Sequence, residues 1–95
     1  MTEYFDDLET REPEVREAAL MAALPAQIAR AKATEGYGEI LADVDPAEVT
    51  GRAALAALPV TRKSELVELQ QTAPPFGGLN ATAPGEMARL FHSPG

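Results

Sequence analysis

The stretch PEVREAALMAALPAQIARAKATEGYG, residues 13–38, decides how this chain folds. Its first residue is a proline, which suits the first turn of a helix because its missing N–H costs nothing there. Pro25 interrupts the apolar run, but it can open a further helix, since Leu20, Leu24 and Ile28 keep a spacing of four across it. The stretch therefore predicts one helix as far as Leu24 and a second that starts at Pro25 and ends near the glycines of Gly-Tyr-Gly.

Two threonines indicate further helix starts. Thr50 can offer its side-chain oxygen to the free N–H groups of a helix that runs to Leu58, and Thr61 can do the same for the next helix. Pro74 and Pro75 stop that last helix, because neither residue can continue the hydrogen-bond ladder. The expected fold is mainly α, a small helical array of four to five helices.

After the proline pair the pattern changes. Residues 76–95 predict a loop followed by one short C-terminal β-strand, from Met87 to Phe91. Gly77-Gly78 could be a hinge, but a flexible turn is the favoured interpretation. We therefore divide the chain into a helical N-terminal segment, 1–75, and a loop-plus-strand segment, 76–95.

Composition excludes several classes of protein. Without cysteine, neither a disulfide framework nor a thiolate metal site can form, and one histidine cannot build a zinc site unless carboxylates supply most ligands. The net charge of −7, with only eight cations, argues against nucleic-acid binding. No apolar run approaches the ~20 residues that span a bilayer, and the acidic N-terminus does not resemble a signal peptide. We expect a cytoplasmic chain with no nucleic-acid and no membrane partner.

Candidate catalytic groups are isolated in the sequence. His92 could be a general base, but no nucleophile or orienting acid accompanies it, and a strand residue with a satisfied polar tip is the favoured interpretation. Asp6 and Asp7, like Asp43 and Asp45, place carboxylates close together, yet the spacing of a calcium-binding loop is absent. We interpret these acids as solvated helix ends, and we predict neither a catalytic residue nor a metal site.

Three stretches carry a family resemblance. LPVTRKSELVELQ (58–70) combines a Leu-Pro-x-Thr turn, a basic residue and a short helix. PPFGGLNATAPGEMARLFHSPG (74–95) combines Pro-Phe-Gly, a loop with a proline and a segment carrying Arg-Leu. Together with the opening YFDDLETREPEVRE (4–17), they resemble the beginning of a phenylacetate-CoA ligase, one of the adenylate-forming, AMP-producing acyl-CoA synthetases. The resemblance covers essentially the whole chain.

The resemblance implies a role for the last residues. In that family, the strand after Pro-Phe-Gly leads into a Ser/Thr/Gly-rich loop whose backbone N–H groups hold the phosphates of ATP. Ser93 and Gly95 match positions of this loop, so they would bind the cofactor only within a longer parent chain, and residues 76–95 would end in the truncated start of the loop. Phe91 and Pro94 stand where the family has His and a second Ser, and proline offers a phosphate no N–H.

The resemblance and the helical pattern lead to two functional hypotheses. In the first, the chain is the N-terminal helical fragment of a phenylacetate-CoA ligase-like protein, which joins an aryl or acyl carboxylate to CoA while ATP becomes AMP. ATP, Mg²⁺ and CoA are then implied for the full-length protein, whereas the fragment alone binds no cofactor and is catalytically inactive. Its partners would be the remainder of the parent ligase and a second copy in a homodimer. In the second hypothesis, the chain is a stand-alone helical protein-interaction module.

Overall fold

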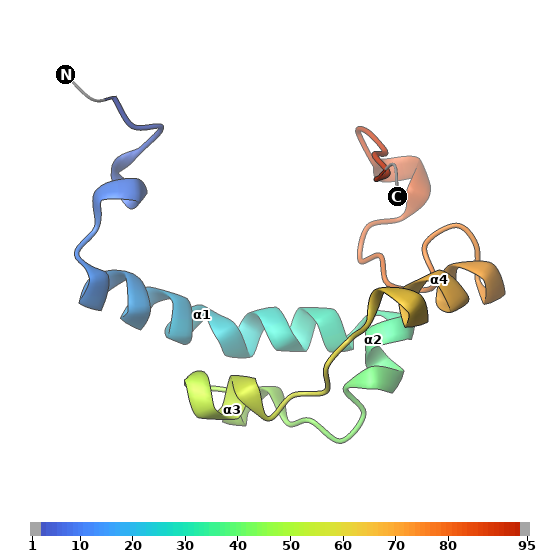
Figure 1. The fold of residues 1–95 in the computed structure, drawn as a ribbon, viewed down its shortest axis with the longest axis horizontal. Helices are drawn as coiled ribbons and strands as arrows, with labels where there is room; N and C mark the ends of the chain where they lie inside the picture. Colours follow the sequence, from blue (N-terminus) through green and yellow to red (C-terminus); the bar gives the residue numbers. More distant parts are fainter. Residues whose placement is uncertain (1–2, 94–95) are drawn as a thin grey trace.

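The computed structural model describes residues 3–93, and these residues form helices, turns and irregular segments without a strand (Figure 1). Within that range there are four α-helices: α1 (Pro13–Lys32), α2 (Glu35–Ile40), α3 (Arg52–Ala56) and α4 (Lys63–Thr72). Three short 3₁₀ helices accompany them: η1 (Asp7–Thr10), η2 (Pro46–Glu48) and η3 (Pro84–Glu86). The prediction of a mainly α chain is confirmed.

Helix α1 runs through Pro25 without ending, so the prediction of two helices in this stretch was wrong. Its 20 residues correspond to a length of about 30 Å. A proline inside a helix removes one backbone hydrogen bond. The alanines around it favour helix strongly, and Leu24 and Ile28, on either side of the proline, both pack into the same core. The packing therefore holds both halves of α1 in one helix.

The core is small and sits beside the C-terminal half of α1. Its buried side chains are Ile28, Leu41 and Val49, from α1, the end of α2 and the end of η2. Partly buried residues pack around them: Leu24, Ala31, Tyr37, Ile40, Val44, Ala54 and Leu58. The Nζ of Lys32 donates to the backbone oxygen of Val44 at 2.7 Å, which fixes the connection between α2 and η2 against the end of α1.

Helix α2 begins where the sequence predicts an end. Thr34 is its N-cap: the side-chain oxygen accepts from the N–H of Tyr37 at 3.2 Å, and the hydroxyl donates to the Ala31 oxygen at 2.7 Å. Gly36 and Gly38 lie inside this helix, so their interpretation as a helix stop was wrong. The cap satisfies free N–H groups at the start of the helix, and this outweighs the low helix propensity of two glycines.

The predicted caps of α3 and α4 were each one residue early. Gly51, not Thr50, is the N-cap of α3, and Arg62, not Thr61, is the N-cap of α4. At α4 the backbone N–H of Arg62 donates to the carboxylate of Glu65 at 3.2 Å, so an acid in the first turn takes part in the cap. The helix ends at Thr72, just before the proline pair, as predicted.

The predicted C-terminal strand, Met87 to Phe91, is absent. Met87 has extended backbone angles, but among the described residues no second segment pairs with it, and a strand forms only when a neighbour accepts and donates its ladder hydrogen bonds. Leu90 and Phe91 are 66% and 81% exposed. The local sequence therefore permits an extended backbone here, while the fold supplies no sheet for it to join.

The chain is far more open than a compact domain of its size. Its radius of gyration is 16.4 Å, whereas a compact chain of this length has about 12 Å. In Figure 1, α1 spans much of the long axis, with residues 3–12 at one end and α2, α4 and the C-terminal segment at the other. The core contacts of α1 therefore lie along its C-terminal half.

The turn at Gly77 gives a first test of the fold. Gly77 has a φ of 66°, and a Cβ there would lie 2.9 Å from the Cβ of Leu69. We expect Gly77→Ala to lower the free energy of unfolding by about 1–3 kcal/mol, through left-handed strain and the clash with α4. Urea unfolding followed by far-UV circular dichroism measures this change.

Gly85→Ala is the matched control, because nothing lies within 4 Å of a Cβ at that position. Its unfolding free energy should stay within about 0.5 kcal/mol of the unmodified chain. Equal losses in the two variants would contradict a packed turn at Gly77.

Candidate functional site

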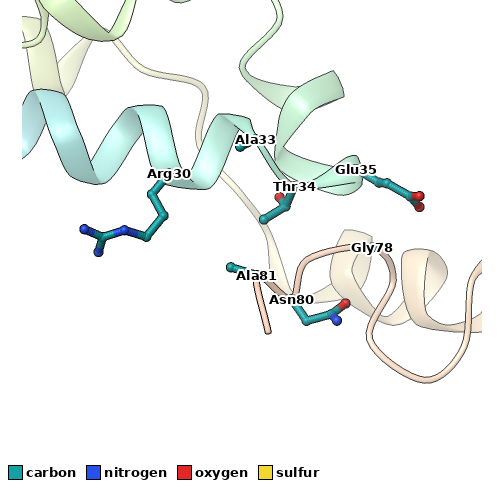
Figure 2. A pocket seen from close by; sticks show the side chains of 7 residues that line it. All are labelled: Arg30, Ala33, Thr34, Glu35, Gly78, Asn80 and Ala81. Atoms are coloured by element: carbon teal, nitrogen blue, oxygen red, sulfur yellow. The ribbon is translucent and has the colours of Figure 1, made fainter. Parts of the chain in front are cut away.

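A hollow lies between the end of α1, the start of α2 and the loop after Gly77 (Figure 2). Its volume is about 500 Å³. The lining residues come from two parts of the chain that are far apart in the sequence: Arg30, Ala33, Thr34, Glu35, Gly78, Asn80 and Ala81. We call this site the polar hollow.

A close backbone contact between glycines builds the polar hollow. The N–H of Gly36 donates to the oxygen of Gly78 at 2.8 Å. A Cβ on Gly36 would lie 2.7 Å from the Cδ2 of Leu79 and 3.0 Å from the oxygen of Gly77, so a larger residue would push the loop away. Gly78 has a φ of 74°, which other residues rarely adopt. These glycines bring Asn80 to the end of α1, and Gly77-Gly78 lie in a turn, as predicted.

The polar groups of the hollow can bind but do not form a catalytic set. Arg30 donates from Nη1 to the Oε1 of Gln27 at 3.0 Å, and the Nδ2 of Asn80 donates to the oxygen of Thr82 at 2.9 Å. In Figure 2 the side chains of Arg30 and Glu35 point in opposite directions, so they do not neutralise each other. The Thr34 hydroxyl is already used in the cap of α2. The charged groups of the hollow are thus the guanidinium of Arg30, which suits a carboxylate or a phosphate, and the carboxylate of Glu35, which points away from it.

The residues that the resemblance implies lie away from the polar hollow. Ser93 is exposed in an irregular segment and does not line the hollow, and Gly95 lies outside the described residues, as does Pro94. His92 is exposed as well, and its Nδ1 lies 3.3 Å from the backbone oxygen of Ser93. The expectation that His92 sits in a strand was wrong, because the strand itself is absent.

Two of the paired acids are helix caps. The Oδ1 of Asp6 accepts from the N–H of Leu8 at 3.0 Å, and the Oδ1 of Asp45 accepts from the N–H of Ala47 at 3.1 Å. Their interpretation as acids at helix ends is confirmed. Within residues 3–93, no three His, Asp or Glu side chains come together in a way that could hold a metal ion.

One ion pair joins elements that the sequence did not connect. Arg52 on α3 donates to Glu17 on α1 through two bonds, Nε to Oε1 at 2.5 Å and Nη2 to Oε2 at 2.7 Å. The hydrogen bond from Arg52 holds the pKa of Glu17 below its ordinary value, and the same bond raises the pKa of Arg52. Both side chains reach solvent, so the pair orients α3 rather than serving as an acid–base couple.

Comparisons with protein families, curated proteins and solved structures find nothing that matches this chain. In the part of the chain that the structure describes, no helix has the length and apolar character needed to cross a bilayer.

The pKa of Glu17 gives a test of the ion pair. Because the folded-state pKa is lowered, the pair stabilises the fold above the unfolded pKa of Glu17, and this contribution disappears as the pH falls through the folded value. We expect Arg52→Gln to raise the pKa of Glu17 toward its ordinary value, which an NMR titration of the side-chain carboxyl carbon measures. Arg89→Gln, an exposed arginine in the C-terminal segment, should leave that pKa unchanged. An unaltered Glu17 titration in Arg52→Gln would mean that the pair does not form in solution.

Proposed function

We propose that this chain is the N-terminal helical segment of a phenylacetate-CoA ligase-like protein, and that it acts as a structural part of that enzyme in the cytoplasm. The parent joins an aryl or acyl carboxylate to CoA, and ATP, Mg²⁺ and CoA bind to the complete protein. In this role the segment packs against the remainder of the ligase and carries out no chemical step alone.

The exposed area of the chain is the observation that carries the proposal. Its accessible surface is 7631 Å², whereas a compact monomer of 10.1 kDa exposes about 5,300 Å². The excess of about 2,300 Å² matches the area that one side of an obligate interface buries, about 1,000–2,500 Å². A segment that folds against a larger body needs such a surface.

The exposed apolar side chains lie where a larger body would have to cover them. They occur in the N-terminal residues, on α1 and α3, in and before α4 and in the C-terminal segment: Tyr4, Phe5, Leu8, Val15, Leu20, Leu55, Val60, Val67, Leu90 and Phe91. Only three apolar side chains among the described residues are buried, Ile28, Leu41 and Val49. Isolated exposed apolar residues are ordinary in soluble proteins. An excess of exposed over buried apolar side chains is typical of a segment that packs against a larger protein.

The resemblance supplies the enzyme class within this proposal. Within 58–70 and 74–95 the resemblance rests on a few short motifs, and the sequence departs from the family at Phe91 and Pro94. The motifs are Leu-Pro-x-Thr, a basic residue before a short helix, Pro-Phe-Gly and Arg-Leu. The chain holds no complete set of catalytic groups in its polar hollow, which suits a segment whose parent carries the active site. Ser93, and Gly95 beyond the described residues, would then contribute to the phosphate loop only when the rest of that loop is present.

A stand-alone protein-interaction module is the second candidate function. The same exposed apolar residues favour it, since they could dock a separate protein instead of the remainder of a ligase. The two candidates differ in how the chain continues. An open reading frame of several hundred codons beyond Gly95 supports the ligase, whereas a stop codon there supports the module.

The enzymatic test uses the protein translated from that longer frame. We expect it to release pyrophosphate from ATP in the presence of an aryl or acyl carboxylate and to form the CoA thioester. Ser93→Ala should lower kcat/KM about tenfold or more, because a hydrogen bond to a charged phosphate is lost. Ser64→Ala, on the exposed side of α4, is the matched control and should retain full activity. Absence of acid-dependent pyrophosphate release with every carboxylate tested would overturn the proposal.

The 95-residue chain alone should bind ATP more weakly than about 1 mM, as measured by isothermal titration calorimetry. Ser93 is exposed, and ordering a chain end around a phosphate costs conformational entropy that no other phosphate-loop residue offsets here. Micromolar affinity would contradict this expectation and would make Arg30 in the polar hollow the candidate phosphate ligand.

A further inference from the structure

The first ten or so residues form a charged segment with exposed aromatic side chains. We call residues 3–12 the arm. Every residue from 3 to 10 is exposed, with Phe5 at 90% and Tyr4 at 58%. The arm is also strongly acidic, because Asp6, Asp7 and Glu9 lie next to these rings. It leaves the N-terminal end of α1, at the opposite end of that helix from α2 (Figure 1). The arm therefore presents exposed aromatic rings beside carboxylates, which an apolar surface with a neighbouring positive charge could bind.

A groove of complementary character lies along α1. Its volume is about 370 Å³, and most of its lining is apolar: Leu20, Ala23, Leu24, Ala26, Gln27 and Arg30. Arg30 also lines the polar hollow, so the groove and the hollow meet at its guanidinium. The groove thus offers apolar contact along its length and one positive charge at its end.

The charge of Arg30 remains available to a carboxylate. Of its five N–H donors, the structure assigns one to Gln27, a neutral side chain on the same helix. Among the described residues, the structure shows an ion pair between Arg52 and Glu17, and it shows none that involves Arg30. In a chain of net charge −7, an exposed guanidinium beside an apolar groove favours an acidic, apolar occupant.

We propose that the arm of a second copy of this chain occupies the groove, with Phe5 against the apolar lining and the carboxylate of Asp7 at Arg30. Arg30 lies 17 positions after Pro13, about 25 Å along α1, and the chain's own arm leaves from the far end of that helix. An antiparallel pairing of two α1 helices brings each arm to the partner's groove. The contact then forms twice about a two-fold axis, as an isologous dimer requires.

The exposed area is sufficient for this dimer. A stable interface buries about 600–1,000 Å² on each partner, less than half of the excess surface of the chain. The dimer does not depend on the ligase assignment, because it uses only the arm and the groove. It also leaves the C-terminal segment, with Leu90 and Phe91, outside the dimer interface.

Sedimentation equilibrium of the 95-residue chain tests the proposal. We expect a dimer in the micromolar range, with a dissociation constant that rises about tenfold or more in Phe5→Ser and in Arg30→Glu. Both residues are exposed, so these variants should keep the far-UV circular dichroism spectrum of the unmodified chain. The double variant Arg30→Glu with Asp7→Lys should recover part of the lost affinity, because the two charges are exchanged.

Arg89→Glu is the matched control for charge, since it makes the same change on an exposed arginine outside the arm and the groove. It should leave the dissociation constant unchanged. A chain that stays monomeric over the whole range, or a dimer that Phe5→Ser and Arg30→Glu do not weaken, would overturn the proposal.

Covalent trapping tests the geometry directly, because the chain has no cysteine of its own. When Phe5→Cys and Arg30→Cys variants are mixed under oxidising conditions, we expect a disulfide between one chain of each kind. Phe5→Cys mixed with Arg89→Cys should give far less of the mixed product. Equal yields from the two mixtures would contradict the placement of the arm.

Discussion

Ile28 is buried against Leu41 and Val49, and the rest of the structure depends on this contact. It joins the C-terminal half of α1 to the ends of α2 and η2, which are otherwise short elements that could not persist alone. Each buried side chain of this type contributes about 1.5–3 kcal/mol. The position of Ile28, three residues after Pro25, also explains why α1 continues through the proline: breaking the helix there would withdraw Ile28 or Leu24 from the core.

Partly buried apolar side chains surround this contact, and polar or backbone interactions orient the segments that lie farther from it. The N–H of Gly36 holds the loop at Gly78, Lys32 holds the carbonyl of Val44, and Arg52 holds Glu17. Such contacts orient segments accurately, but they bury little surface. The outcome is an elongated chain with a small core and a large exposed area, which supports the proposal that another surface covers it.

The polar hollow and the groove along α1 meet at Arg30. Both are lined by Arg30, and neither holds a nucleophile with an adjacent base. The guanidinium of Arg30 can pair with an anionic group, and the apolar lining of the groove can contact a ring or an aliphatic side chain. A ligase segment and an interaction module would both use such surfaces. The described geometry therefore does not distinguish the two proposed functions. A reading frame that continues beyond Gly95 would distinguish them.

The sequence by itself determined the helical class, the start of α1 at Pro13, the end of α4 before the proline pair and the position of Asp6 and Asp45 at helix ends. These features depend on residues a few positions apart, whose spacing and donor chemistry can be traced along the chain. Only the tertiary structure decided that α1 passes through Pro25, that Gly36 lies inside a helix and that Arg52 meets Glu17. It also decided that Met87 to Phe91 forms no strand, since a strand needs a partner from elsewhere in the chain. Each of these depends on contacts between distant residues, and local spacing carries no information about which distant residues meet.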